Sequence, residues 1–530
     1  MRTISLVVLL AAFSLFSKFG WGQQITQIDY LKDEYWWGAA VGSGERMPYI
    51  EPAKEFDLAS RNDNNQVIPM LLSNKGRYIW SDEPFRFSIG DKCMTIRSDY
   101  EKIAVVNAGK TLRAAYLEAC RKHFKPSGKL PDSLFFTMPQ YNTWIELMYN
   151  QNQEDILKYA QGILDSGLPP GVLMIDDNWQ RYYGNFDFRS EKFPDPKGII
   201  SRLHEMGFKV MLWVCPFVSA DSPEARMLGE KGYLIKRGKY KPAILSWWNG
   251  QSACYDFTNP EAVAYFVSQL KDLQTTYGVD GFKFDAGDNA FYTGKDLISY
   301  KPNAKSVDHT EAWLKIGLEF PFNEYRAGWS MGGQSLVYRL GDKRYSWGAV
   351  QSLVPEMTAA GLMGYAYTCP DMIGGGQYRS FLNVDPTRFD QALIVRSAQV
   401  HALMPMMQFS VAPWRILNAE NMAIVKAAAL LHKQFGPYIM QCARESSQTG
   451  EPIVRHMEYA FPNEGFASCK DQYMLGDNYM IAPVVTKENR RTVQLPKGIW
   501  KDDLEEIHQG GKTIMIEVPL SRLPYFERMK

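Results

Sequence analysis

The stretch GVDGFKFDAGD, residues 278–288, decides how the rest of the chain is interpreted. It has the apolar character of a buried β-strand, yet Lys283 and Asp285 stand two positions apart in it. Side chains alternate along a strand, so these two project to one face while Phe282 and Phe284 project to the other. An ammonium and a carboxylate in a packed interior are costly unless they serve each other or a ligand. The stretch therefore indicates either a buried ion pair at a strand end or a ligand site.

The composition is that of a soluble globular protein. The chain has 530 residues, of which 45% are hydrophobic and 22% charged, so we expect about two to four domains. A net charge of +1 predicts no general attraction to nucleic acid or to an anionic membrane. Aromatic residues make up 13% of the chain, which suits a protein that stacks on the apolar faces of sugars.

The first 22 residues predict export. Arg2 supplies a positive start, residues 4–16 form an apolar run too short to span a bilayer, and small residues at 20–22 offer a cleavage site. No later stretch is apolar enough to predict a membrane span. The seven cysteines are scattered, which fits neither a disulfide framework nor a zinc pattern. We therefore expect a signal peptide at 1–22 and a mature protein that is periplasmic or secreted.

Three folded parts are expected after the signal. Residues 23–126 combine short strand-like pieces with a helix near 112–123, which predicts an N-terminal β-sandwich. Residues 441–530 predict a small C-terminal β-sandwich. Strands and helices alternate between them, over 127–440, which is typical of a parallel sheet with helices outside it. The strands are expected at 134–141, 171–179, 209–217, 281–287, 327–332, 335–340 and 362–369.

An eight-stranded α/β barrel, the (β/α)8 TIM barrel, is favoured over an open sheet for the central part. The reason is that no glycine-rich phosphate-binding fingerprint follows the first strand. In such a barrel the chemistry takes place at the C-terminal ends of the strands. The side chains expected there in this chain are mainly acidic or aromatic, with one lysine. They are Asp176, Asp177, Trp179, Trp213, Lys283, Asp285, Asp288, Asp342 and Asp371.

A single strand-end aspartate is usually a helix cap or a turn residue. Five successive strand ends with such residues favour a carboxylate active site instead, either for metal binding or for cleavage of a glycosidic bond. His204-Glu205 is not followed by the second histidine of a zinc helix, and no calcium-loop pattern occurs. We therefore predict a glycosidase with no metal and no cofactor.

Several segments resemble glycoside hydrolase family 31, the retaining α-glycosidases. GVDGFKFDAGD is similar to the nucleophile segment of that family, and YRLGDKRYSW (338–347) to its acid/base segment. The resemblance implies Asp285 as the nucleophile and Asp342 as the proton donor and acceptor. WWNG (247–250) and LPKGIW (495–500) also recur in that family, so the resemblance extends over nearly the whole mature chain and implies a sandwich, barrel, sandwich layout.

The same resemblance implies the sugar contacts. Arg326 stands sixteen positions before Asp342, and CPDMIGGG (369–376) and QVHALMPMMQ (399–408) carry Asp371 and His401 where the family places sugar-binding groups. Arg339 stands where many family members have tryptophan, and Trp213 is expected to floor the sugar pocket.

The predicted sugar is galactose. IDDNWQ (175–180), with Asp176 and Asp177, and the Lys-Phe-Asp strand with Lys283 resemble α-galactosidase segments whose polar groups reach the hydroxyls around C3, C4 and C6. We therefore predict an exo-acting, retaining α-galactosidase whose partner is an α-galactoside oligosaccharide or glycoconjugate.

Four alternatives stay open. The first is an α-glucosidase or α-xylosidase of the same family, the second a transglycosylase, and the third a non-catalytic carbohydrate-binding protein. The fourth is that Asp177 and Lys283 pair for structural reasons alone. The sequence does not define the natural linkage or the oligomeric state.

Overall fold

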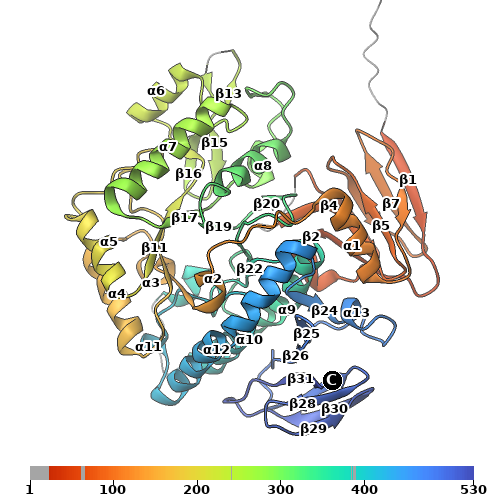
Figure 1. Ribbon diagram of the computed structural model, residues 1–530. Helices are drawn as coiled ribbons and strands as arrows, with labels where there is room; N and C mark the ends of the chain where they lie inside the picture. The colour runs from red at the N-terminus through yellow and green to blue at the C-terminus, as the bar shows by residue number, and fades with distance from the viewer. Residues whose placement is uncertain (1–22, 61–65, 240, 383–384, 386–388, 530) are drawn as a thin grey trace, which may run out of the picture.

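The computed structural model describes residues 23–60, 66–239, 241–382, 385 and 389–529. The predicted signal at 1–22 lies outside the described residues. Figure 1 shows β-sheets at the N-terminal end (red and orange), a central barrel with helices around it, and further sheets at the C-terminal end (blue). Within the described part of the chain, no helix is long and apolar enough to cross a membrane.

Two antiparallel sheets form the N-terminal part. One consists of β1 (Gln24–Asp29), β7 (Cys93–Ser98), β6 (Arg86–Ile89) and β3 (Ala53–Asp57). The other contains β2 (Trp36–Ala40), β4 (Gln66–Ser73), β5 (Arg77–Trp80) and β8 (Val105–Asn107). Strand β7 alternates between buried and half-buried residues, as expected for a strand with one face on a core. Helix α1 (Leu112–His123) forms where it was predicted, and it packs on the second sheet; Thr111 caps its N-terminus.

Eight parallel strands form the barrel sheet, which confirms the predicted fold class. In chain order they are β9 (Gln140–Asn142), β10 (Val172–Ile175), β11 (Lys209–Val214), β17 (Gly281–Phe284), β19 (Phe322–Tyr325), β21 (Tyr338–Arg339), β22 (Thr368–Cys369) and β23 (Gln408–Phe409). From β9 to β22 each strand pairs with the next, and β23 pairs back with β9. The ring is nearly closed: β22 and β23 share no ladder, but Ile373 N donates to Gln408 O just beyond β22.

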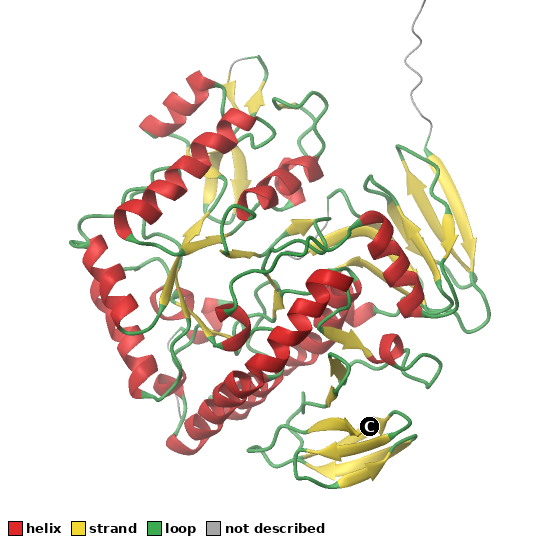
Figure 2. Ribbon diagram, viewed as in Figure 1, coloured by secondary structure: helices red, strands yellow, loops and turns green. Residues whose placement is uncertain are grey.

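Helices cover the outside of the barrel (Figure 2). They are α2 (Leu134–Thr137), α3 (Trp144–Leu147), α4 (Gln153–Asp165), α5 (Pro196–Glu205), α7 (Pro260–Tyr277), α8 (Ser306–Gly317), α9 (Trp347–Leu362), α10 (Gln391–Ala402), α11 (Pro413–Ile416) and α12 (Ala419–Thr449). Their starts are encoded locally. For example, Asp195 caps α5, Asn259 caps α7 and Ser346 caps α9 through side-chain oxygens.

An insertion follows β11 and extends over the barrel mouth. It contains β12 (Phe217–Ser219), α6 (Pro223–Lys231), β13 (Lys236–Arg237), β14 (Lys241–Pro242), β15 (Leu245–Trp247) and β16 (Gly250–Cys254). After β17 the chain adds the short helix η2 (Asn289–Tyr292) and β18 (Leu297–Ile298), and β18 pairs with β13.

The C-terminal part holds two sheets. The larger consists of β24 (Val454–His456), β25 (Tyr473–Leu475), β26 (Tyr479–Ile481), β31 (Tyr525–Met529), β28 (Ile499–Asp502) and β29 (Ile507–Gln509). The smaller pairs β27 (Arg490–Leu495) with β30 (Lys512–Glu517). Helix α13 (Met457–Ala460) follows β24. Helix α12 runs through the boundary that the sequence placed at residue 440.

Two strand predictions need correction, and two barrel strands were not predicted. Residues 134–137 form α2, so the first barrel strand begins only at β9. Residues 328–329 form β20 (Gly328–Trp329), which leaves the barrel and pairs in parallel with β4 of the N-terminal sheet. Strands β19 and β23 were missed. Strand β19 turns a carboxylate, Glu324, into the barrel interior, so the strand does not have the hydrophobic pattern of a buried strand.

Gly281→Ala is expected to destabilise the protein. A Cβ at Gly281, the first residue of β17, would lie 2.0 Å from the backbone oxygen of Phe322 on β19, so the two strands would have to separate. Overpacking of this kind costs about 1–3 kcal/mol, and thermal unfolding should show a lower Tm. The matched control is Gly348→Ala near the start of α9, where an added Cβ has open space. Equal Tm values for the two variants would contradict the expected tight packing of β17 on β19.

Candidate active site

A cavity of about 440 Å³ lies at the C-terminal ends of the barrel strands. Eight of the ten predicted site residues line it, the exceptions being Asp371 and His401. Its full lining is Trp144, Tyr149, Asp176, Asp177, Trp213, Trp248, Lys283, Asp285, Arg326, Arg339, Asp342, Met372, Gly376, Gln377, Tyr378 and Arg379. Residues from β10, β11, β17, β19, β21 and the loops that follow them therefore meet at one mouth, as the barrel geometry requires.

Asp285, directly after β17, is enclosed and anchored through both of its oxygens. Its Oδ1 accepts from Arg326 Nε and its Oδ2 from Trp213 Nε1, each at 2.9 Å. Burial alone would raise the pKa of this carboxyl group. The charges of Arg326, Lys283 and Arg339 outweigh burial and hold its pKa well below the ordinary value. Asp285 is therefore an anion at any pH at which the protein would work.

Lys283 does not pair with Asp285, nor does it pair with Asp177. Its Nζ lies 2.6 Å from Oδ2 of Asp176, and both side chains are almost fully buried. The positive charge of Lys283 still acts through space on Asp285, whose pKa it lowers. Both possibilities raised by the sequence thus apply: the lysine forms a buried ion pair, and it also lies at the wall of the cavity.

Asp177 is an acid of the site with one oxygen left without a partner among the described residues. Its Oδ2 accepts from Asn249 Nδ2 at 2.8 Å and from Tyr183 Oη at 3.1 Å. Its Oδ1 is buried and has no hydrogen-bond partner among the described residues. Burial and the neighbouring charge of Asp176 raise the pKa of Asp177 to about 8. At neutral pH this carboxyl group is therefore protonated, and it has a hydrogen-bonding position free for a ligand hydroxyl.

Asp342 differs from Asp285 in its access to water. Its side chain is 40% exposed, whereas that of Asp285 is 13% exposed. Its Oδ1 accepts from Arg339 NH1 at 2.8 Å. The same guanidinium nitrogen donates to Asp371 Oδ1, also at 2.8 Å. One acid of the cavity is thus enclosed and ionised, and the other is open to exchange protons with solvent.

Arg326 joins Asp285 to a second acid. Its NH2 donates to Asp288 Oδ2 at 2.8 Å, so one guanidinium binds two carboxylates. The backbone oxygens of Arg326 and Arg339 both accept from Gln66 Nε2, and Gln66 lies on β4 of the N-terminal sheet. The N-terminal part of the chain therefore helps to place Arg326 and Arg339.

Asp371 and His401, predicted as sugar contacts, lie behind the cavity wall. Asp371 Oδ2 accepts from the backbone nitrogens of Lys343 and Gly376, at 2.6 and 2.9 Å. The two ring nitrogens of His401 lie within hydrogen-bond distance of the Ser397 and Asp371 carbonyls. With their polar atoms occupied in this way, both residues support Arg339 and the 371–376 loop. The geometry gives no support to a direct sugar contact by either of them.

Gly376 is required at this point of the loop. A Cβ there would lie 2.9 Å from the carboxyl group of Asp342 and 3.0 Å from Oδ1 of Asp371. The glycine therefore leaves room for two carboxyl groups to approach one backbone.

The sequence analysis assigned no role to the cavity-lining residues Trp248, Tyr149, Tyr378 and Arg379. The WWNG segment gave a signal, because two adjacent tryptophans before a turn are unusual for a small hairpin. Glu324 was missed for a different reason: it lies below the cavity and accepts from Gln408 Nε2 at 2.7 Å. No pattern in a four-residue strand marks such a residue.

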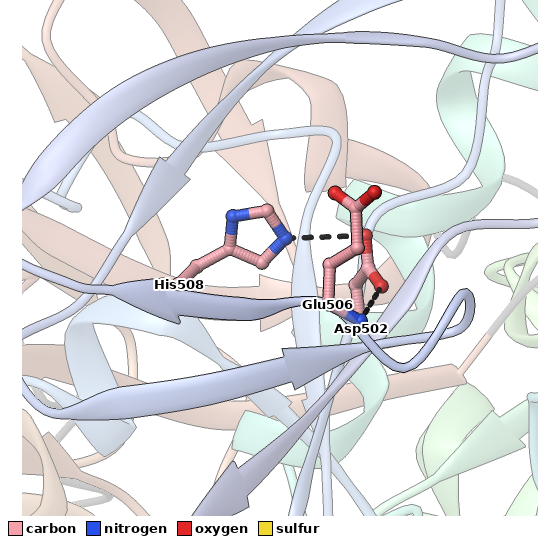
Figure 3. A group of neighbouring side chains, drawn as sticks. All are labelled: Asp502, Glu506 and His508. Atoms are coloured by element: carbon pink, nitrogen blue, oxygen red, sulfur yellow. Dashed lines mark hydrogen bonds and ion pairs between the residues drawn. The ribbon is translucent and has the colours of Figure 1, made fainter.

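A second cluster of possible metal ligands lies far from this site in the C-terminal sheets. Figure 3 shows Asp502, Glu506 and His508, whose ligand atoms all lie within 4.8 Å of one another. Both oxygens of Asp502 are already in use: Oδ1 accepts from two backbone nitrogens, and Oδ2 accepts from His508 and from Arg522. The arginine cation beside Oδ2 opposes a bound cation. The cluster is therefore explained as the organiser of a turn.

Asp177→Asn is expected to flatten the pH dependence of stability. The folded-state pKa of Asp177 is raised to about 8, from 3.8. Its contribution to stability is therefore full below about pH 4 and is lost as the pH rises through 8. Asparagine has no proton to lose, so Tm of the variant relative to wild type should rise steadily between these limits. Thermal melts across this range measure the difference, and a constant difference would contradict the raised pKa.

The comparisons with known proteins agree with this geometry. The description "Glycosyl hydrolases family 31 TIM-barrel domain" matches residues 136–442, and "Glycosyl hydrolase family 31 C-terminal domain" matches residues 450–529. The chain is 32% identical over 437 residues to the myogenesis-regulating glycosidase of Mus musculus. That match covers 79% of this chain and 60% of the mouse protein.

Two further relatives extend the comparison. The α-xylosidase XylQ of Lactiplantibacillus pentosus is 23% identical over 531 residues, which cover 92% of this chain and 67% of that protein. The solved structure of the family 31 dextranase of Flavobacterium johnsoniae with glucose superposes with a TM-score of 0.84 at 21% identity. It covers 96% of this chain and 66% of the dextranase chain, so this likeness concerns the fold.

The present chain thus spans about 60% of the length of its mouse relative. The barrel match alone covers more than half of the chain, and the C-terminal match is independent of the site residues. The chain therefore belongs to glycosyl hydrolase family 31.

Proposed function

We propose that the protein is a retaining α-glycosidase with Asp285 as nucleophile and Asp342 as acid/base. The observation that carries the proposal is the contrast between these two acids in one cavity. Asp285 is enclosed, bound to Arg326 and held ionised, while Asp342 is 40% exposed and open to solvent. Double displacement needs this division: one carboxylate that attacks and one carboxyl group that exchanges protons.

In the first step, an oxygen of Asp285 bonds to the anomeric carbon while the bond from that carbon to the leaving oxygen breaks. Asp342 gives its proton to the leaving oxygen. In the second step, Asp342, now a carboxylate, takes a proton from water, and the water oxygen displaces Asp285 from the same carbon. Two inversions give net retention. Arg326 and Lys283 stabilise the anion that leaves in the second step.

Two substrate classes follow from different observations. Relatives of this chain are named α-xylosidase and α-glucosidase, which favours α-xylosides or α-glucosides. The polar wall formed by Asp176, Asp177 and Lys283 favours the α-galactoside inferred from the sequence, because it offers donors and acceptors for an axial hydroxyl. The names of the relatives are the stronger support, and they favour an α-xyloside or α-glucoside. The galactoside hypothesis rests on the polar wall.

The substrate class is tested with 4-nitrophenyl α-xyloside, α-glucoside and α-galactoside. We expect turnover of one of them at a kcat/KM at least about tenfold above the others, since one misplaced or missing hydroxyl partner costs about 1–3 kcal/mol. A preference for the xyloside or glucoside refutes the galactoside hypothesis. A product of the opposite anomeric configuration, seen by proton NMR during turnover, would refute retention. Absence of turnover with all three and with oligosaccharides would favour the carbohydrate-binding alternative. Sugar transfer to an added acceptor in place of water would favour the transglycosylase.

The two acids should respond differently to substitution. Asp285→Asn is expected to abolish turnover of every substrate, because a neutral amide oxygen is too weak a nucleophile to form the covalent intermediate. Asp342→Ala should lower turnover of a sugar leaving group by about 10²–10⁴-fold, and much less when the leaving group needs no proton.

The leaving groups to compare are a second sugar, which leaves through its hydroxyl oxygen, and fluoride, each on the same glycosyl residue. Asp221→Asn, at a side chain that is 98% exposed on the insertion, is the control and should match wild type. Equal losses with both leaving groups in Asp342→Ala would contradict its role as the general acid.

A further inference from the structure

The turn between β15 and β16 projects two side chains into the active site from the insertion. Trp248 lines the cavity, and its neighbour Asn249 donates from Nδ2 to Asp177 Oδ2 and to Tyr183 Oη, each at 2.8 Å. Asn249 Oδ1 accepts from Tyr149 Oη at 2.7 Å. The turn is thereby fixed to the acid pair after β10 and to the loop after β9.

The Trp248 side chain is partly exposed, but neighbouring side chains pack against it. Trp248 is 47% exposed, a larger exposed fraction than that of any other tryptophan among the described residues. One face of its ring lies against the Arg326 guanidinium, whose Cζ is 5.0 Å from the ring centroid. Trp247 and Phe291 hold its edges at centroid distances of 5.1 and 6.0 Å. A large aromatic ring fixed in this way at a cavity mouth covers little of the core, so its surface is available to a ligand.

Tyr149 provides a second aromatic surface at the same mouth. Its residue is 38% exposed, and its ring packs edge-on against Trp144 at 5.3 Å. The hydrogen bond from its hydroxyl to Asn249 links it to the turn that carries Trp248. Two half-exposed aromatic side chains from separate loops are thus joined through one asparagine.

We propose that Trp248, with Tyr149 beside it, binds the leaving group of the substrate and that this leaving group is a sugar ring. This inference rests on the proposed function. The buried polar wall with Asp176, Lys283 and Asp285 encloses the glycosyl residue that is attacked. The group released must then lie toward the exposed part of the cavity, where these aromatic side chains are.

The chemistry of this mouth fits a pyranose. A pyranose ring presents C–H groups on its flat faces and hydroxyl groups at its edges. The ring of Trp248 suits such a face. Polar side chains at the same mouth, including the exposed Arg379, suit the edge hydroxyls. An extended alkyl leaving group would make no use of the polar side chains.

The competing explanation is that Trp248 only shields Arg326 from water. In that case its loss would disturb Asp285 through Arg326 and would slow every substrate equally. A leaving group that makes no contact at the mouth separates the two explanations, and fluoride is such a group.

The experiment compares an α-linked disaccharide with the α-glycosyl fluoride of the same glycosyl residue, the one that wild type prefers. In Trp248→Ala, kcat/KM for the disaccharide should fall at least about tenfold more than that for the fluoride. Trp248→Phe keeps a ring and should recover most of the loss. The control is Tyr300→Ala, at an aromatic residue that is 62% exposed and outside the cavity lining, and its ratio should equal that of wild type.

Equal losses for both substrates in Trp248→Ala, or no loss for either, would overturn the inference while leaving the glycosidase proposal intact. Failure of wild type to hydrolyse the fluorides and disaccharides of all three sugars would instead overturn the proposed function, and this inference with it. The two failures are distinguished by wild type alone.

Discussion

Charge compensation inside the barrel mouth is the constraint on which the site depends. Seven acidic side chains, Asp176, Asp177, Asp285, Asp288, Glu324, Asp342 and Asp371, lie in or just below the cavity, together with three buried cations, Lys283, Arg326 and Arg339. Buried charges are tolerated when they are paired, so the few buried cations strongly affect which of the buried carboxyl groups stay ionised. The positions of the cations therefore select which acids carry the charge.

The selection is visible in the pKa values. Asp285 lies within reach of all three cations, and its pKa is lowered despite burial. Burial and the neighbouring charge of Asp176 raise the pKa of Asp177 to about 8. Burial also raises the pKa of Asp371, to about 6, although Arg339 is beside it. Asp285 is thus held ionised and Asp177 protonated within the same cavity, which is what a nucleophile among sugar-binding groups requires.

The sequence predicted the parts of this arrangement that local patterns encode. Strand alternation placed Lys283 and Asp285 on one face, and both line the cavity. The partners were not predictable, since pairing depends on strands that are distant in sequence. Lys283 binds Asp176, 107 positions away, and not its neighbour Asp177. His401 shows the opposite limit: a family pattern marked it as a sugar-binding group, but only the fold shows that its ring nitrogens lie against backbone carbonyls.

The junction between the N-terminal sheet and the barrel has a consequence for inheritance. The segment after β19 crosses to extend the sheet that contains β4, and Gln66 on β4 holds the carbonyls of the two arginines. The region matched as a barrel begins only at residue 136. Recombination between related genes at that border would separate the arginines from the glutamine that fixes their main chain. The N-terminal sheets and the barrel are therefore expected to be inherited together.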